Sequence, residues 1–202
     1  MKLYDSTPAP NPRRVRIFLA EKALHIPLEP VDIKRRVNRQ EPFREKNPFG
    51  TIPVLELDDG SCISESVAIC RYFEELQPEP PLFGSGARER AEVEMWNRRV
   101  ELNLFQAVGL VWIHGSPLTA AVVEQIPQNV EPQRKRAKHF FDVLDHTLRA
   151  RPFLAGEHFS IADISALCVI DFARIVQIRP APEHEQIARW HAQVSARPSA
   201  RA

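Results

Sequence analysis

The residues with the clearest chemical potential are an acid and a serine, Glu65 and Ser66, at the predicted start of a helix. The first turn of a helix carries free backbone N–H groups and the positive end of the helix dipole, so it attracts a carboxylate. Ser66 and its amide suit such a carboxylate, while Glu65 suits an ammonium group. Taken alone, an acid and a serine at this position are also common capping chemistry.

A second segment, Asn47 to Leu55, reads NPFGTIPVL and lies ten residues upstream of Glu65. Its last residues are apolar and β-branched, so they predict a strand that Pro53 begins. Without its neighbours, Pro53 is explained equally well as a plain strand-opening proline. With Glu65 and Ser66 following downstream, a binding role is favoured for Pro53.

The elements that must position these residues alternate between short strands and helices through residue 77. Four strands are predicted, at residues 2–5, 31–33, 51–57 and 62–63. Three helices are predicted: one that Asn11 caps before Pro12, a short one over residues 41–46, and one that Ser64 caps, with Ile69, Cys70, Phe73 and Leu76 inward. This order predicts a four-stranded mixed sheet in the arrangement of thioredoxin.

From about residue 87 the sequence indicates helix only. Prolines and glycines predict a linker at residues 78–87, which separates a domain of residues 1–77 from an all-helical domain of residues 88–202. The long helix over residues 88–114 is predicted to turn one face inward, formed by Met95, Leu102, Phe105, Gly109 and Trp112, and Gly109 to let it bend. Further helices are predicted over residues 133–149, from Ser160 to about Ile175, and around Trp190.

The motifs resemble the cytosolic glutathione transferase family. The resemblance rests on Asn47 to Leu55 with Glu65 to Ile69, and on Phe153 to Asp163, which reads FLAGEHFSIAD. Arg14 to Ile17 and Ala196 to Ser199 extend it to nearly the whole chain. It implies an α/β thioredoxin-like N-terminal domain that holds glutathione and an all-α C-terminal domain that holds the second substrate.

The resemblance also implies how glutathione is held. The proline that corresponds to Pro53 is cis in the family, so the backbone of Ile52 pairs with the cysteinyl unit like an added strand. Ser66 then suits the γ-glutamyl carboxylate, and Glu65 suits the γ-glutamyl ammonium group.

The glycyl carboxylate of glutathione needs a cation or amide donors. By resemblance this contact falls to Asn38 and Arg39, and the basic run from Lys34 to Arg36 can substitute. A solvated basic loop explains each of these residues equally well.

Activation of the thiol is where the sequence departs from the family. A thiol has a pKa of about 8.5, so an enzyme must stabilise the thiolate with a donor near the first helix. The family uses Tyr, Ser or Cys there, but the Ser or Cys position falls at Ala9 or Pro10. Asn11 is the first candidate, and His114, acting through a water, is the second. Other polar residues nearby in sequence are Tyr4, which is expected in the core, Ser6 and Thr7.

The predicted activity is conjugation of glutathione to a hydrophobic electrophile, with glutathione as a co-substrate and no cofactor. The wall for the electrophile is expected at Phe105, Val108 and Trp112, with Ile113 beside them. Isomerisation and reductive dehalogenation begin from the same thiolate. The alternative is a non-catalytic glutathione-binding or regulatory protein, because the usual donor is missing.

Composition limits the other possibilities. The net charge is +1, with 27 basic and 26 acidic residues, so nothing draws the chain to nucleic acid or an anionic membrane. Three cysteines without a CxxC pair predict a reducing cytoplasm, with Cys62 and Cys70 in the core. His139 and His146 are too far apart along a helix to share a metal. Detoxification and a homodimer are expected by resemblance.

Asp163 resembles the family's helix-capping aspartate, with Ser160 as the cap. Its replacement by alanine is expected to cost about 1 kcal/mol or more in stability, without a direct effect on chemistry.

Overall fold

The computed structural model describes every residue from Met1 to Ala202. The chain forms two compact units: Met1–Leu82 together with Pro198–Ala202, and Phe83–Arg197. The division falls within residues 78–87. The C-terminal segment Pro198–Ala202, which the sequence assigns to the helical domain, joins the first unit.

The first unit contains a four-stranded sheet in the order β2-β1-β3-β4, so the predicted mixed sheet is confirmed. Its strands are β1 (Lys2–Asp5), β2 (Leu28–Pro30), β3 (Val54–Glu56) and β4 (Cys62–Ser64). Strands β1 and β2 are parallel, whereas β3 is antiparallel to both of its neighbours.

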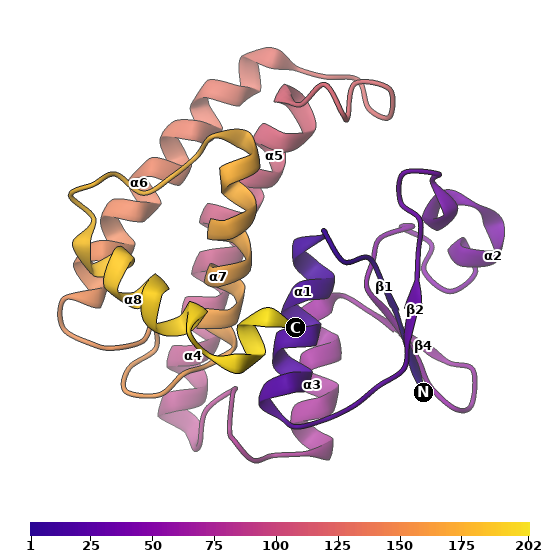
Figure 1. The fold of residues 1–202 in the computed structure, drawn as a ribbon, viewed down its shortest axis with the longest axis horizontal. Coiled ribbons are helices and arrows are strands. Elements are labelled where there is room, and N and C mark those ends of the chain that lie inside the picture. Colours follow the sequence, from indigo (N-terminus) through magenta and orange to yellow (C-terminus); the bar gives the residue numbers. More distant parts are fainter. The chain divides into compact units, whose positions relative to one another are not determined.

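Helices cover both faces of this sheet. Helices α1 (Pro10–Glu21) and α3 (Ser66–Leu76) pack against each other on one side, and α2 (Glu41–Arg44), preceded by the turn η1 (Val37–Arg39), lies on the other (Figure 1). On the α2 side, a core forms from Tyr4, Val31, Phe43 and Val54. The short helix η5 (Pro198–Arg201) packs on α1.

The predicted position of the second strand, residues 31–33, is wrong by about three residues. Oδ1 of Asp32 accepts the backbone N–H groups of Lys34 and Arg35, each at 3.0 Å. An aspartate that binds the backbone two and three residues onward makes a turn, so the chain leaves the sheet at this point. Strand β2 therefore ends at Pro30.

Both predicted N-caps of the first unit are also wrong. Helix α1 begins at Pro10 with Ala9 as its N-cap, because the fixed φ of proline suits the first helical position, and Asn11 follows one residue inside. Ser64 is the last residue of β4, and Glu65 is the N-cap of α3. On α3, Ile69, Cys70 and Phe73 are buried as predicted, but Leu76 is 56% exposed.

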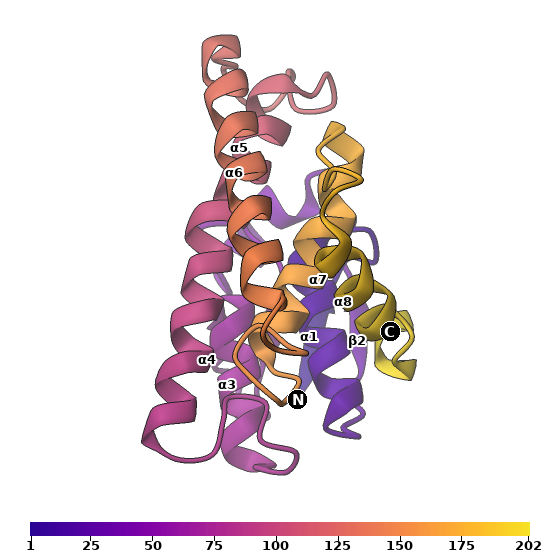
Figure 2. The ribbon, with the colours of Figure 1, turned by 90° about the vertical axis from the view of Figure 1, so that its left-hand side faces the viewer.

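The second unit is all-helical, as predicted. It contains α4 (Ala87–Arg99), the π-helical segment η2 (Val100–Phe105), α5 (Gln106–Gly115), η3 (Pro127–Asn129), α6 (Val130–Leu148), α7 (Ile161–Ala173), η4 (Arg174–Val176) and α8 (Glu185–Ser195). Helix α6 lies alongside α5, and α8 contacts both α6 and α7 (Figure 2).

The predicted inward face of the long helix is wrong. Met95 and Leu102 are 39% and 46% exposed, whereas the buried stripe runs through Trp96, Asn97 and Val100. The stripe is hard to recognise because it contains a polar residue: Asn97 is fully buried, and its Oδ1 accepts the hydroxyl of Ser165 at 2.6 Å. This hydrogen bond offsets only part of the cost of burying the amide, because Nδ2 of Asn97 has no hydrogen-bond partner in the chain.

The irregularity in this helix is the π-helical segment Val100–Phe105 rather than a bend at Gly109. A π turn offsets the hydrogen-bonding pattern of the helix and leaves a carbonyl for another donor. The carbonyl of Leu102 accepts Nη2 of Arg136 from α6 at 2.8 Å.

Helix α7 has the predicted capping box of Ser160 and Asp163. Its residues from Ile161 to Ile170 are all buried, as expected for a central helix. Trp190 of α8 is also fully buried.

Candidate functional site

The pairing of two strands brings both sequence motifs to one end of the sheet. In the antiparallel pair of β3 and β4, Val54 lies opposite Ser64. Ile52 and Pro53 immediately precede Val54, and Glu65 and Ser66 immediately follow Ser64. The proline loop and the N-terminus of α3 are therefore neighbours, although residues 57–61 separate their strands in sequence.

The loop that leads to Pro53 is fixed by a buried side chain. Nδ2 of Asn47 donates to the carbonyl and the hydroxyl of Thr51, each at 2.9 Å, and its Oδ1 accepts the N–H of Phe49 at 3.2 Å. Asn47 is fully buried. One amide group thus takes the place of regular secondary structure and sets the shape of the loop.

Asn38 and Arg39, which the sequence predicts to bind the glycyl carboxylate, donate hydrogen bonds to the backbone of the same loop. Asn38 Nδ2 donates to the carbonyl of Gly50 at 2.7 Å, and Arg39 Nη1 donates to the carbonyl of Phe49 at 2.9 Å. Gly50 has a φ of +58°, and a Cβ there would lie 2.6 Å from the backbone oxygen of Asn38. Asn38 and Arg39 thus use one donor each within the protein, and their remaining N–H groups are available to a ligand.

The Ile52–Pro53 peptide bond is cis, as the resemblance implies. Ile52 lies just outside β3, and neither its N–H nor its C=O makes a hydrogen bond within the chain. A half-buried residue with both main-chain groups unpaired can pair with an extended peptide.

Glu65 and Ser66 differ sharply in exposure. Glu65 is exposed with a φ of +68°, in the left-handed region that residues other than glycine rarely adopt, and its carboxylate has no partner in the chain. Ser66, the first residue of α3, is only 5% exposed. The arrangement presents a free acid beside a helix N-terminus.

Arg14 is the residue of this site that the sequence reasoning missed. It is 2% exposed, and its Nη1 donates to Oγ of Ser66 at 2.7 Å. The sequence position of Arg14 could have indicated its burial. Arg14 directly precedes Val15 and lies four residues before Phe18, and both of these residues are on the buried face of α1. Arginine is almost never buried without a partner.

The first turn of α1 is unusually poor in backbone donors. Pro10 and Pro12 have no N–H group, and Arg13 donates its own to the carbonyl of Ala9 at 3.2 Å. Asn11 thus supplies the remaining backbone N–H of the turn, and its half-buried side chain makes no hydrogen bond within the chain.

His114 lies in the last turn of α5, in the second unit. Its Nδ1 accepts the backbone N–H of Ile126 at 3.2 Å. With Nδ1 as an acceptor, the neutral ring carries its proton on Nε2, which is then the donor left for another group.

The predicted wall for a second substrate is only partly accessible. Phe105 and Trp112 are half-buried, and the Trp112 ring packs edge-on against Phe172 at 5.6 Å. Val108, by contrast, is fully buried and belongs to the core stripe of α5, so its inclusion in an open wall is wrong.

A separate charged cluster lies on the α2 side of the sheet. Oε2 of Glu56 accepts the Tyr4 hydroxyl and Nζ of Lys46, each at 2.7 Å. The hydrogen bond to Glu56 raises the pKa of Lys46 to about 12, and that of Glu56 is lowered mainly by Lys46. Burial raises the pKa of the nearby Cys62 thiol, so this cysteine is a poor nucleophile.

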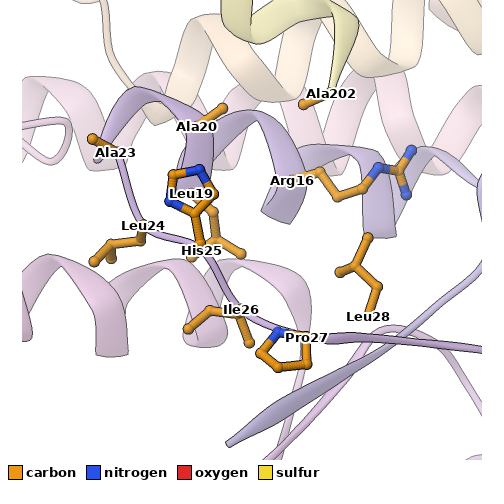
Figure 3. A pocket seen from close by; sticks show the side chains of 10 residues that line it. All are labelled: Arg16, Leu19, Ala20, Ala23, Leu24, His25, Ile26, Pro27, Leu28 and Ala202. Carbon is orange, nitrogen blue, oxygen red and sulfur yellow. The ribbon is translucent and has the colours of Figure 1, made fainter.

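A surface hollow of about 770 Å³ lies elsewhere in the first unit (Figure 3). Leu19, Ala20, His25 and Ile26 are among its lining residues, and none of the predicted glutathione-binding residues is. In the whole chain, no three His, Cys, Asp or Glu side chains gather into a metal site. No helix has the length and apolar character needed to cross a membrane.

A mixed-sheet unit with this proline loop, followed in sequence by an all-helical unit, defines the glutathione transferase architecture. Residues 9–76 match the family described as "Glutathione S-transferase, N-terminal domain", and residues 110–198 match "Glutathione S-transferase, C-terminal domain". The chain belongs to the glutathione S-transferase family.

Individual relatives are similar to this chain over nearly its whole length. Glutathione S-transferase 2 of Saccharomyces cerevisiae is 37% identical over 98% of this chain and 87% of its own length. The crystal structure of a glutathione S-transferase domain-containing protein from Marinobacter aquaeolei VT8 is 38% identical, with a TM-score of 0.95 over 98% of this chain and 99% of that one. The structure of Gtt2 from Saccharomyces cerevisiae is 36% identical, with a TM-score of 0.95 over 100% and 99% of the two chains.

Proposed function

We propose that the protein is a glutathione transferase that adds the thiolate of glutathione to a hydrophobic electrophile. The observation that carries this proposal is the convergence of Ile52–Pro53 and Glu65–Ser66 at one end of the sheet. The unpaired main chain of Ile52 suits the cysteinyl unit, because an extended peptide can pair with it. The exposed Glu65 carboxylate suits the ammonium group, and Ser66 at the helix N-terminus suits the γ-glutamyl carboxylate.

The opposite end of glutathione requires positive charge. Arg39 and the exposed run from Lys34 to Arg36 supply it, and Asn38 adds an amide donor. Because Asn38 and Arg39 also donate to the carbonyls of Gly50 and Phe49, respectively, a carboxylate bound there would stabilise the loop that presents Ile52.

Thiol activation is assigned first to Asn11. Its backbone N–H and its side-chain amide are the donors that the first turn of α1 offers, at the positive end of the helix dipole. The bound thiol loses its proton to solvent, and the sulfur lone pair then forms the C–S bond. In a displacement, the leaving group departs with its electron pair. Nε2–H of His114, acting through a water, is the second candidate.

The second substrate is assigned to two apolar side chains that keep exposed surface, Phe105 at the end of η2 and Trp112 of α5. Phe105 is the last residue of the π-helical segment, and π turns are frequent at functional sites. A cytoplasmic homodimer with a role in detoxification completes the proposal.

One observation favours a non-catalytic glutathione-binding protein. Ala9 and Pro10 occupy the positions at which the resemblance places a thiol-activating Ser or Cys. A protein that only binds glutathione needs Ile52, Glu65 and Ser66 but no such donor.

Turnover separates the two functions. Conjugation of glutathione to a chlorodinitrobenzene is measured for the natural protein, Asn11→Ala and Glu65→Gln, with glutathione binding followed by calorimetry. The transferase proposal predicts turnover that Asn11→Ala reduces mainly in kcat and Glu65→Gln reduces mainly through KM for glutathione. Binding without turnover across several classes of electrophile would establish the non-catalytic function instead.

A further inference from the structure

A buried arginine contacts the serine that the proposed function assigns to the γ-glutamyl carboxylate. Arg14 lies on the inner face of α1, where α1 packs against α3. Its Nη1 donates to Oγ of Ser66 at 2.7 Å, and the two residues are 2% and 5% exposed. A charge-assisted hydrogen bond between two buried groups is a fixed structural feature.

The direction of this hydrogen bond determines what Ser66 can do. A serine hydroxyl has two lone pairs and one hydrogen, and a guanidinium can only donate. One lone pair of Oγ is therefore occupied by Arg14, and the hydroxyl hydrogen points away from the arginine. The bond from Arg14 is the only hydrogen bond of the Ser66 hydroxyl in the chain. The hydroxyl is thus a donor that still needs an acceptor.

The surroundings specify that acceptor. Ser66 is the first residue of α3, so the positive end of the helix dipole adds to the buried charge of Arg14. In a site of low dielectric, donation from a cation also strengthens the O–H as a donor. An anion fits this position better than a neutral acceptor.

We propose that Arg14 is a positioning residue that holds the Ser66 hydroxyl as a dedicated donor to the α-carboxylate of the γ-glutamyl unit. Arg14 does not touch the ligand; it acts through Ser66. The inference rests on the proposed binding of glutathione, and it adds a determinant of specificity for the carboxylate of its first residue.

The test uses calorimetric binding of two peptides to the full-length protein. One is glutathione, and the other is 4-aminobutyryl-cysteinyl-glycine, which lacks only the carboxylate in question. The variants are Arg14→Met, Ser66→Ala and the double variant. Arg13→Met is the matched control, because Arg13 is the neighbouring residue on α1 and donates instead to the carbonyl of Ala200.

Each single variant is expected to weaken glutathione binding about tenfold or more, the usual loss for a hydrogen bond to a charged group, and to leave the analogue within about twofold. The double variant should bind glutathione no more weakly than either single variant, because both act on one donor. Arg13→Met should bind both peptides normally.

Equal weakening of both peptides by Arg14→Met, or additive losses in the double variant, would overturn the inference. If Arg14→Met does not fold, as far-ultraviolet circular dichroism would reveal, Arg14→Lys replaces it. Lysine keeps the charge but lacks the guanidinium fork, so the same selective loss is expected. Failure of the natural protein to bind glutathione would instead contradict the proposed function itself.

Discussion

Trp190 donates its indole N–H to Oδ1 of Asp163 at 2.8 Å and so connects α8 to the first turn of α7. The same carboxylate accepts the N–H of Leu154 and both the N–H and the hydroxyl of Ser160, each at 3.0 Å. Asp163 is fully buried. The helix cap predicted from the sequence is therefore also the junction of three segments of the helical unit.

Replacement of Asp163 by alanine should destabilise the protein by about 3 kcal/mol or more, because it leaves several buried donors without an acceptor. Trp190→Phe removes one of these donors and keeps the others paired, so its loss should be smaller. Chemical denaturation followed by circular dichroism measures both. A stable but inactive Asp163→Ala variant would show that the residue acts in chemistry instead.

The same carboxylate should make stability depend on pH. Burial raises the pKa of Asp163 to about 6, although the hydrogen bonds from its four donors act to lower it. In the unfolded chain the pKa is about 3.9, so between these values the folded state binds more protons. The stability from this group is complete below about pH 4, and about 3 kcal/mol of it is lost as the pH rises through about 6.

The difference in unfolding free energy between the natural protein and Asp163→Asn isolates this effect from other acids. As the pH rises from about 4 to about 6, the natural protein should lose stability relative to Asp163→Asn, because asparagine does not titrate. A difference that is constant across this range would contradict the raised pKa.

Lys22 should be essential to the first unit. Its buried Nζ donates to the carbonyls of Gln77, Pro78 and Pro80, at 2.7, 3.1 and 2.5 Å, and lies 2.6 Å from Oε2 of Glu74. Removing one member of a buried charged pair typically costs about 3–5 kcal/mol, and Lys22→Met should do so. The exposed Lys34→Met should change the free energy of unfolding by about 0.5 kcal/mol or less. Equal stability of the two variants would refute the importance of this contact.

Gly50 and Gly60 form a matched pair for testing the binding loop. Both have positive φ, at +58° and +84°, but an added Cβ meets the backbone of Asn38 only at Gly50. Alanine at either position should cost about 1–2 kcal/mol through its backbone conformation. Only Gly50→Ala should also raise KM for glutathione, because it displaces the loop that presents Ile52. A similar rise in KM for Gly60→Ala would show that loop geometry is not the cause.

Much of the fold follows from local patterns in the sequence. The strand at Lys2–Asp5 and the helices α6 and α8 lie where the sequence predicts them, to within a few residues, and the cap of α7 follows from Ser160 and Asp163. The errors occur where a single side chain overrides the local pattern. Asp32 ends β2 through its own hydrogen bonds, and the buried Asn97 hides the inner face of α4.

The candidate site was predictable as a set of motifs but not as a geometry. The proximity of Ile52 to Glu65 depends on strand register, and the contact between Arg14 and Ser66 depends on how α1 packs on α3. Neither relationship is visible in sequence spacing. The use of Asn38 and Arg39 as loop supports likewise appears only in three dimensions.

The most direct test of the account is the ionisation of bound glutathione, followed by the ultraviolet absorbance of its thiolate as a function of pH. With the natural protein at saturation, the thiol pKa should fall by about 1 unit or more below its ordinary value of about 8.5. Asn11→Ala should remove most of that shift while glutathione still binds, and His114→Ala should remove less. Saturated binding with an unshifted thiol pKa would contradict the proposed transferase mechanism.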